Sequence, residues 1–287
     1  MPRGKAKQLV EEGGEQVEGA VAGQVSGAEA GQAEEAAEQV VAALEGGASG
    51  NVQYGMNTLL IDNGSKYLEG IETHVNTAAE KLGVEGHSLE KKSMKELKGM
   101  YVASVKEDKE SGVPEKEWGK AFKQYIKGFQ YIVSSGSPRL AKYDQKMHEK
   151  ISDAASDAVF LGVCHGAQQL ASAYGAKLKK TKHTHQGKRG ADVNEAHLEN
   201  PALEGTHEGG HMENYGHHKW YIPVDQAGSN LEVIAESESP KTKDKFVEMF
   251  KLSGKDHYGA QFHPEKGDGE LIFNTFGLAH KKYKKAA

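Results

Sequence analysis

The sequence has a single cysteine among its 287 residues, so an internal disulfide is excluded and the chain suits a reducing compartment. It has no apolar run near the roughly 20 residues that a membrane-spanning helix needs. Its first residues, Met1 to Gly14, lack the apolar core of a secretory signal peptide. These absences predict a soluble cytoplasmic protein that is neither a disulfide scaffold nor a membrane protein.

An excess of charge is confined to the start of the chain. The formal net charge is −5. Residues 1–50 hold three Lys or Arg and nine Glu, a net of −6, which leaves +1 for the other residues. A nearly neutral body gives no electrostatic reason to expect nucleic-acid binding.

Residues 1–50 also lack aromatic residues and hold ten of the 35 glycines. Each glycine costs a helix about 1 kcal/mol relative to alanine, and few apolar residues are available to bury. We therefore expect residues 1–55 to form a low-complexity acidic tail that is mostly disordered. The alternative is a partner-docking helix at 33–44, where apolar residues recur at helical spacing. Residues 56–287 are expected to form one domain.

Beyond Met56, short apolar runs alternate with segments of helical character. The runs at 58–62, 129–133 and 159–163 are typical of buried strands. We expect helices at 67–82, 116–127, 143–155, 165–174 and 269–283, a weak strand at 84–89, and further strands, some antiparallel, at 219–224, 231–235 and 258–262. This alternation predicts an α/β fold, a three-layer αβα sandwich around a mostly parallel open sheet.

The most informative segment surrounds the cysteine. A buried strand is expected to end at Cys164 and a helix to begin directly after it, with Gly162 and Gly166 on either side. This is the pattern of a nucleophile elbow, in which a sharp turn exposes the nucleophile above the sheet. The helix N-terminus favours a thiolate, and the backbone N–H of His165 points to where an oxyanion would form. The segment predicts a cysteine nucleophile, with a small buried cysteine as the alternative.

A thiolate nucleophile needs a base, and the base needs an orienting group. Of the fourteen histidines, His263 stands at the end of an apolar run, two residues before Glu265. Side chains two apart in an extended chain lie on the same face, and Pro264 restricts the backbone between them. The pattern predicts a triad in which His263 accepts the Cys164 proton and Glu265 sets the His263 tautomer.

These two motifs, in this order, resemble those of the class I (triad-type) glutamine amidotransferases, which carry G-x-C-x-G-x-Q and a strand ending in His-Pro-Glu. Here the motifs are Gly162, Cys164, Gly166 and Gln168, then Gln261-Phe-His-Pro-Glu265. The similarity covers residues 56–280. The early segment 59–65, Leu-Leu-Ile-Asp-Asn-Gly-Ser, looks most like the glutaminase part of GMP synthase. The resemblance implies a flavodoxin-like amidotransferase domain.

The resemblance also implies a reaction without a cofactor. Cys164 would attack the side-chain amide of L-glutamine, giving a γ-glutamyl thioester and ammonia, which would pass to a separate synthetase. Gln168 would contact the bound glutamine. His217 and His218 lie where the family has a histidine-bearing strand beside the glutamine pocket, and at most one should face it, because only alternate strand residues share a face.

The family's oxyanion loop reads Ser-Gly-Gly-Pro, whereas the corresponding segment here is Ser135-Gly-Ser-Pro138. Gly136 and Ser137 would form the oxyanion hole together with the backbone of His165. If the second position needs a glycine-like conformation, Ser137 adopts it at a cost of about 1–3 kcal/mol. Backbone donation survives any side chain, so the loop remains compatible with activity.

Other functions on the same fold remain open from the sequence. A stand-alone γ-glutamyl hydrolase would use the same thioester on larger substrates. A catalytically degenerate regulatory or scaffold subunit is favoured by Ser137. The Cys164-His-Gly166 segment also resembles the PfpI family, which lacks the terminal His-Pro-Glu, so His263 and Glu265 favour the amidotransferase.

A cluster of histidines needs a separate explanation, because histidine is a common metal ligand. Seven lie between residues 183 and 218: His183, His185, His197, His207, His211, His217 and His218. No HxxxH pair lies on a credible helix, and no cysteine joins them. We therefore expect a solvated histidine-rich loop and no metal site.

Overall fold

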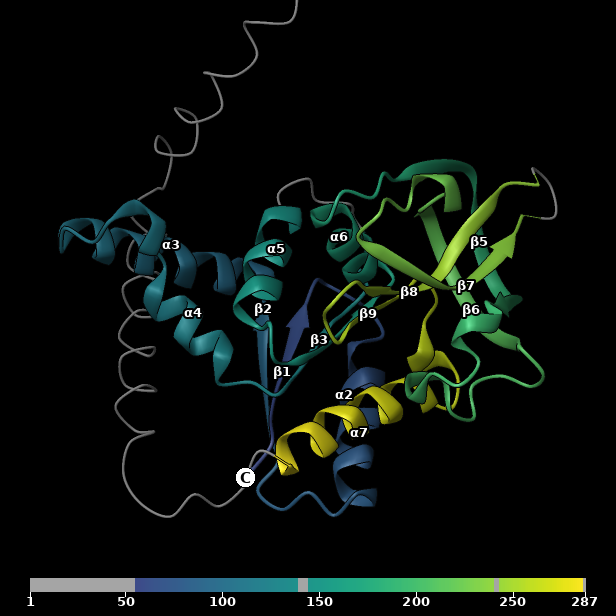
Figure 1. Cartoon of the computed structure of the whole chain (residues 1–287), viewed down its shortest axis with the longest axis horizontal. Helices are drawn as coiled ribbons and strands as arrows, with labels where there is room; N and C mark the ends of the chain where they lie inside the picture. Colours follow the sequence, from purple (N-terminus) through teal and green to yellow (C-terminus); the bar gives the residue numbers. More distant parts are fainter. Residues whose placement is uncertain (1–54, 139–143, 240–242, 286–287) are drawn as a thin grey trace, which may run out of the picture.

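A computed structural model describes residues 55–138, 144–239 and 243–285, apart from the side chains of His183 and His185 (Figure 1). The strands are β1 (Asn57–Asp62), β2 (Ser88–Ser93), β3 (Tyr131–Ser134), β4 (Val159–Val163), β5 (Lys179–Val193), β6 (His211–Tyr221), β7 (Leu231–Glu238), β8 (Lys245–Leu252) and β9 (His257–Ala260). The α-helices are α2 (Leu68–Lys81), α3 (Met94–Glu110), α4 (Lys120–Lys127), α5 (Asp144–Ala154), α6 (His165–Ala173) and α7 (Glu270–Lys284). The predicted tail at 1–55 and the helix at 33–44 fall almost wholly outside these ranges.

All nine of these strands belong to one sheet, in the order β2-β1-β3-β4-β9-β8-β7-β5-β6. Neighbours from β2 to β9 are parallel, and neighbours from β9 to β6 are antiparallel. The predicted α/β fold, with a parallel open sheet and antiparallel additions near the C-terminus, is confirmed. Because β4 and β9 are parallel neighbours, the residues that follow them meet at the same edge of the sheet.

Helices cover both faces of the parallel strands and give two apolar cores (Figure 1). Helices α2 and α7 pack on one face, and α3 to α6 pack on the other. On β1, Leu60 belongs to the first core while Leu59 and Ile61 belong to the second, as the two-residue period of a strand requires. Each fully buried side chain of this kind contributes about 1.5–3 kcal/mol relative to exposure. The three expected layers follow from strands that are apolar on both faces.

The Lys- and Glu-rich segment 90–128 contains a long helix, α3, that the sequence pattern did not predict. Ser93 and Glu96 form a capping box at its start: Ser93 Oγ accepts from Glu96 N at 3.2 Å, and Glu96 Oε2 accepts from Ser93 N at 2.7 Å. Leu97 and Met100 are buried on its inner face. The weak strand expected at 84–89 lies four residues later, as β2, where it pairs with β1.

The prediction of a histidine-rich solvated loop is wrong for most of that segment. Strands β5 and β6 form a long antiparallel ladder in which Gln186 lies opposite His217 and Arg189 lies opposite Asn214. Before Ala191 and Val193, which are buried in the first core, the sequence of β5 is polar on both faces and carries no apolar signal. Its strand conformation comes from backbone pairing with β6. Strand β8, at 245–252, was also not predicted.

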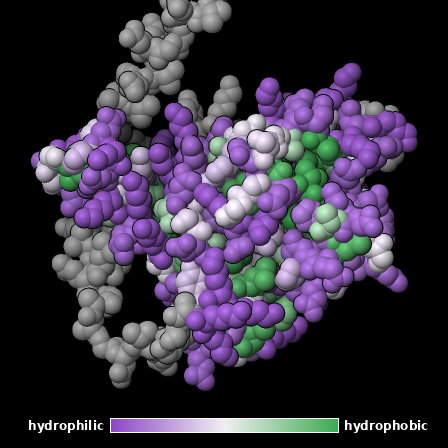
Figure 2. All heavy atoms as spheres, viewed as in Figure 1, coloured by the Kyte–Doolittle hydropathy of each residue, from purple (hydrophilic) through white to green (hydrophobic). Residues whose placement is uncertain are grey.

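Hydrophilic residues cover most of the face shown in Figure 2, including α3 and α4 at its left. Within the described ranges, Val102 of α3 is the exposed large hydrophobic residue, with half of its surface accessible. No helix in those ranges is both long and apolar enough to cross a bilayer. The apolar residues are thus largely committed to the two cores.

Candidate active site

Cys164 occupies a strained turn between β4 and α6. Its backbone has φ 49° and ψ −100°, and within the described ranges Lys243 is the other non-glycine residue with positive φ. Such a conformation costs of order 1–3 kcal/mol and persists where the surroundings enforce it. The side chain is 5% exposed. The strain places the thiol at the carboxyl edge of the sheet and at the N-terminus of α6, as a nucleophile elbow requires.

The two glycines of the elbow are needed because backbone packs against both. A Cβ on Gly162 would lie 2.7 Å from Ala167 N and 2.8 Å from Ala167 Cα. A Cβ on Gly166 would collide with the carbonyl oxygen of Ser134 and lie 2.8 Å from its hydroxyl. Real Cβ atoms essentially never approach so closely, so any other residue forces the turn to move.

His263 and Glu265 form a buried pair beside Cys164. Nδ1 of His263 lies 2.8 Å from Oε1 of Glu265, and the side chains are 5% and 0% exposed. Glu265 lies in a short 3₁₀ turn, Pro264–Lys266, so the pair meets across a turn and not along an extended chain as expected. An ionised carboxylate only accepts, so the bond places a proton on Nδ1 and directs Nε2 elsewhere.

Cys164 is the second partner of the His263 ring. Burial by itself would lower the pKa of His263, but hydrogen bonds to Cys164 and Glu265 and the charges of both outweigh it and raise the pKa well above its usual value. The raised pKa favours the protonated His263 ring. Cys164 thus has a histidine partner that can exchange a proton with it, as a cysteine nucleophile needs.

Replacing Glu265 with glutamine is expected to lower the pKa of His263, because the amide keeps the size of the side chain and removes its charge. In the parent, folding favours protonated His263, so this contribution to stability is complete below about pH 6.5, the unfolded value, and is lost as pH rises through the raised folded pKa. In Glu265→Gln this pH-dependent stabilisation should be smaller and should be lost at a lower pH.

The measurement is an NMR titration of the His263 ring, assigned with His263→Gln, together with urea unfolding between pH 6 and pH 10. Glu85→Gln, which removes an exposed carboxylate, is the matched control and should titrate as the parent does. An unchanged His263 titration in Glu265→Gln would contradict the proposed pair.

Two residues that the sequence did not single out complete the surroundings of the thiol and the imidazole. Gln261 Nε2 lies 3.9 Å from the Cys164 sulfur. The ring of Tyr67 meets the His263 ring edge-on at 5.1 Å between centroids, and its hydroxyl lies 3.3 Å from His217 Nδ1. Gln261 lies in the same motif as His263, so the sequence could have indicated its place near the site. No sequence pattern around Tyr67 indicates that it lies there.

The loop after β3 brings Gly136 against both reactive groups. A Cβ on Gly136 would lie 3.1 Å from His263 Cε1 and 3.7 Å from Cys164 Cβ. The glycine-like conformation considered for Ser137 is not adopted, because neither Gly136 nor Ser137 is among the described residues with positive φ. His165 begins α6 directly after Cys164, and its ring is held by Asp144 at 3.2 Å.

Of the remaining expected binding residues, His217 and His218 follow each other on β6, and Gln168 lies on α6. The carbonyl oxygen of His217 lies 3.9 Å from the Cys164 sulfur. His218 is buried on the opposite face, where its Nε2 contacts Arg189. Gln168 is also turned into the protein: its amide nitrogen donates to Trp220 O at 2.7 Å and to Gln261 Oε1 at 3.1 Å. Of these residues, the structure brings His217 to the reaction centre.

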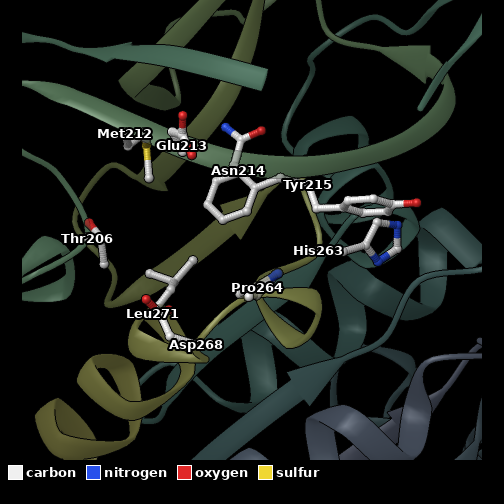
Figure 3. A pocket seen from close by; sticks show the side chains of 11 residues that line it. Thr206, Met212, Glu213, Asn214, Tyr215, His263, Pro264, Asp268 and Leu271 are labelled. Atoms are coloured by element: carbon white, nitrogen blue, oxygen red, sulfur yellow. The ribbon is translucent and has the colours of Figure 1, made fainter. Parts of the chain in front are cut away.

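A pocket opens next to His263 (Figure 3). It is lined by Thr206, Met212, Glu213, Asn214, Tyr215, Phe262, His263, Pro264, Gly267, Asp268 and Leu271. The rings of Tyr215 and His263 stand close together at one end, and Cys164 is not among the lining residues. In the described part of the chain, no three His, Cys, Asp or Glu side chains are grouped so that they could hold a metal ion.

The fold and site together define an α/β domain in which a cysteine at a strained strand-to-helix turn adjoins a buried histidine–carboxylate pair, an arrangement suited to nucleophilic catalysis by a thiol. The family model for class-I glutamine amidotransferases matches residues 59–276. The chain belongs to this family.

The relatives point to the same family. The glutamine-hydrolysing GMP synthase of Christiangramia forsetii is 24% identical over 154 residues, a match that covers 53% of this chain and 28% of that protein. The match therefore spans less than a third of the length of that curated relative. It nevertheless agrees with the resemblance to the glutaminase part of GMP synthase, which is confirmed.

Solved structures share the fold. A Thermoplasma acidophilum protein described as a GMP synthase subunit has a TM-score of 0.53 at 20% identity, covering 80% of this chain and 96% of that one. The glutaminase domain of Trypanosoma brucei CTPS, with bound acivicin, has a TM-score of 0.56 at 12% identity, covering 80% and 94%. The predicted α/β amidotransferase fold is confirmed.

Proposed function

We propose that this chain is a glutaminase that hydrolyses the side-chain amide of L-glutamine through a thioester on Cys164 and supplies ammonia to a separate synthetase. One observation carries the proposal: Cys164 stands on a strained elbow and shares a hydrogen bond with His263, which Glu265 holds from its other side. The synthetase of GMP synthase is the partner we propose, given the relatives, and we propose with it a role in purine biosynthesis in the cytoplasm. The activity is assigned to residues 56–287, with 1–55 as a separate acidic tail.

The proposed reaction proceeds in two stages. The Cys164 thiolate attacks the amide carbon of glutamine, and the imidazolium of His263 gives its proton to the departing nitrogen as the C–N bond breaks, so ammonia leaves. Water then attacks the thioester while His263 takes a proton from it, and glutamate is released with the thiolate restored. Glu265 keeps Nδ1 protonated throughout, so that Nε2 makes each transfer.

The negative charge on the tetrahedral intermediates is stabilised by backbone N–H groups in this proposal. His165 supplies one from the first turn of α6, and the loop at Gly136 and Ser137 supplies the other. A serine at position 137 favoured a degenerate scaffold because it was expected to strain the loop. Ser137 has no positive φ, so this argument for a scaffold is removed. His217 contacts the substrate through its strand, whereas Gln168 and His218 act through the residues they hold in place.

The test is release of ammonia from L-glutamine with and without the synthetase subunit of a GMP synthase. Release that rises when the synthetase is added supports the amidotransferase. Equal release with and without it, together with faster hydrolysis of γ-glutamyl peptides, would point to a stand-alone γ-glutamyl hydrolase. A stable complex without turnover of any γ-glutamyl substrate would support the scaffold alternative.

Acivicin provides a second probe, because it is the compound bound in the Trypanosoma brucei CTPS glutaminase domain. We expect it to label this chain at Cys164, the single cysteine, and excess L-glutamine to slow the labelling. Mass spectrometry of the peptide that contains Cys164 measures the result. Labelling that glutamine does not slow would mean that the amide substrate binds elsewhere.

A further inference from the structure

A cluster of buried polar side chains lies on the opposite face of β6 from His217. Arg189 of β5 is at its centre: Nη2 donates to His218 Nε2 at 2.8 Å and lies 3.1 Å from Oε1 of Glu248. The Phe246 ring centroid lies 5.2 Å from the guanidinium carbon. Because arginine only donates, Nε2 of His218 accepts, so this histidine is neutral with its proton on Nδ1. A single guanidinium thus joins β5, β6 and β8.

The carboxylate in this cluster depends on that guanidinium. Glu248 has no exposed side-chain surface. Burial raises its pKa to about 7, while the charge of Arg189 and a hydrogen bond from Ser237 oppose the rise. Without the close cation, burial would raise the pKa of this carboxyl group further, because the charge of Arg189 partly compensates for the water it has lost. Loss of the guanidinium would therefore change both the charge and the contacts of Glu248.

Two residues of the cluster, His218 and Glu248, connect it to groups near the Cys164 sulfur. His218 directly follows His217, whose carbonyl oxygen lies 3.9 Å from the sulfur of Cys164. The backbone carbonyl of Glu248 accepts from the N–H of Gln261 at 2.8 Å, and the Gln261 side chain lies 3.9 Å from the same sulfur. The guanidinium therefore connects the two strands, β6 and β8, through which these two groups near the thiol are held.

The position of this guanidinium is fixed by the backbone of β6 as well. A Cβ on Gly216 would lie 2.6 Å from Cζ and 2.7 Å from Nε of Arg189. The guanidinium occupies the space that a side chain at Gly216, the residue before His217, would fill. Any shift of Arg189 is thus transmitted to the strand that carries the His217 carbonyl.

We propose that Arg189 is a positioning residue for the reaction centre: it joins Glu248 to His218 and thereby holds Gln261 and His217 at their distances from the Cys164 sulfur. The proposal rests on the proposed function, in which Cys164 is the nucleophile. Arg189 itself touches neither substrate nor sulfur.

The test compares Arg189→Met, Arg189→Lys, and Arg189→Met combined with Glu248→Gln, each studied well below its urea unfolding midpoint. Lys188→Met is the matched control, because Lys188 is the neighbouring residue of β5, also loses one positive charge, and is 84% exposed. Two rates are measured: ammonia release from L-glutamine, as kcat and KM separately, and alkylation by iodoacetamide, which reports on the single cysteine.

In Arg189→Met we expect kcat to fall by about 10- to 100-fold, the size of effect that a misplacement near 1 Å produces. The alkylation rate of Cys164 should change by several-fold, and KM should change less than kcat. Arg189→Lys should recover part of kcat, because lysine keeps a positive charge but lacks the guanidinium Nη2 that contacts both His218 and Glu248. Lys188→Met should match the parent in both rates.

Parent-like kcat and alkylation in folded Arg189→Met would overturn the proposal and leave the cluster a purely structural role. If Arg189→Met does not fold, the double variant, which leaves no unpaired carboxylate, decides by the same criteria. Parent-like rates in the double variant overturn the proposal, and reduced rates support it. If the parent itself releases no ammonia, the proposed function fails, while alkylation of Cys164 still tests the role of Arg189.

Discussion

Cys164→Ala is expected to abolish ammonia release from glutamine, with a fall in kcat of about 10⁴-fold or more, because removing the nucleophile of a triad removes most of its catalysis. The fold should survive. The substitution deletes one sulfur atom at a side chain that is 5% exposed, and its neighbours Gln261 and His217 lie at 3.9 Å. We expect the free energy of unfolding to change by about 1 kcal/mol or less.

The measurement pairs an ammonia assay with urea unfolding monitored by circular dichroism. His280→Gln is the matched control for a general effect of altering the domain, since His280 lies ten residues into α7, about 15 Å along the helix from its start. It should retain parent activity. Ammonia release that persists at the parent rate in folded Cys164→Ala would remove Cys164 from the mechanism.

Gly166→Ala is expected to lower the free energy of unfolding more than any other substitution that adds one methyl group to the elbow. The new Cβ would collide with the carbonyl oxygen of Ser134 and approach its hydroxyl, and both atoms belong to a fully buried residue of β3. Overpacking of this kind costs typically about 1–3 kcal/mol. The shift needed to relieve it moves the N-terminus of α6, so kcat should fall together with the free energy of unfolding.

Gly99→Ala is the comparison for this variant. Gly99 lies within α3, and a Cβ there would meet no atom within 4 Å. Alanine in place of a helical glycine with open space around it is expected to stabilise by about 0.5–1 kcal/mol. Urea unfolding of both variants measures the contrast. If Gly166→Ala proved as stable as Gly99→Ala, the close approach of β3 to the elbow would be wrong.

Three strands of the parallel half of the sheet could be predicted because they are apolar on both faces, whereas the polar strand β2 was placed only approximately. Strands β1, β3 and β4 read as short continuous apolar runs, which is what helices on both sides of a sheet require. The antiparallel half was harder. Strand β5 runs through Lys-Lys-Thr-Lys-His-Thr-His-Gln-Gly, and its conformation is set by β6, which lies outside any local window. Strand β8 differs, because its largely apolar run at 246–250 is a local signal that could have predicted it.

The candidate site divides in the same way. The turn at Cys164 and the pairing of His263 with Glu265 could be predicted from local motifs, although the pair meets across a 3₁₀ turn and not along an extended chain. The contacts of Gln168 could not, since they depend on Trp220 and Gln261, which reach it from other strands. Contacts between strands distant in sequence have no signature in one sequence.

The pairing of β4 with β9 has a consequence for how the protein is made. The thiol at the end of β4 and the side chain of Gln261 are 97 residues apart in sequence, and all four antiparallel strands are synthesised between them. Closing so long a loop is slow and comes late in folding. While the chain is still being synthesised, Cys164 exists without His263 and Glu265, so the imidazole that would activate it is absent. If Cys164 acts as proposed, its activation by His263 therefore becomes possible only after the last strand has been synthesised and has paired with β4.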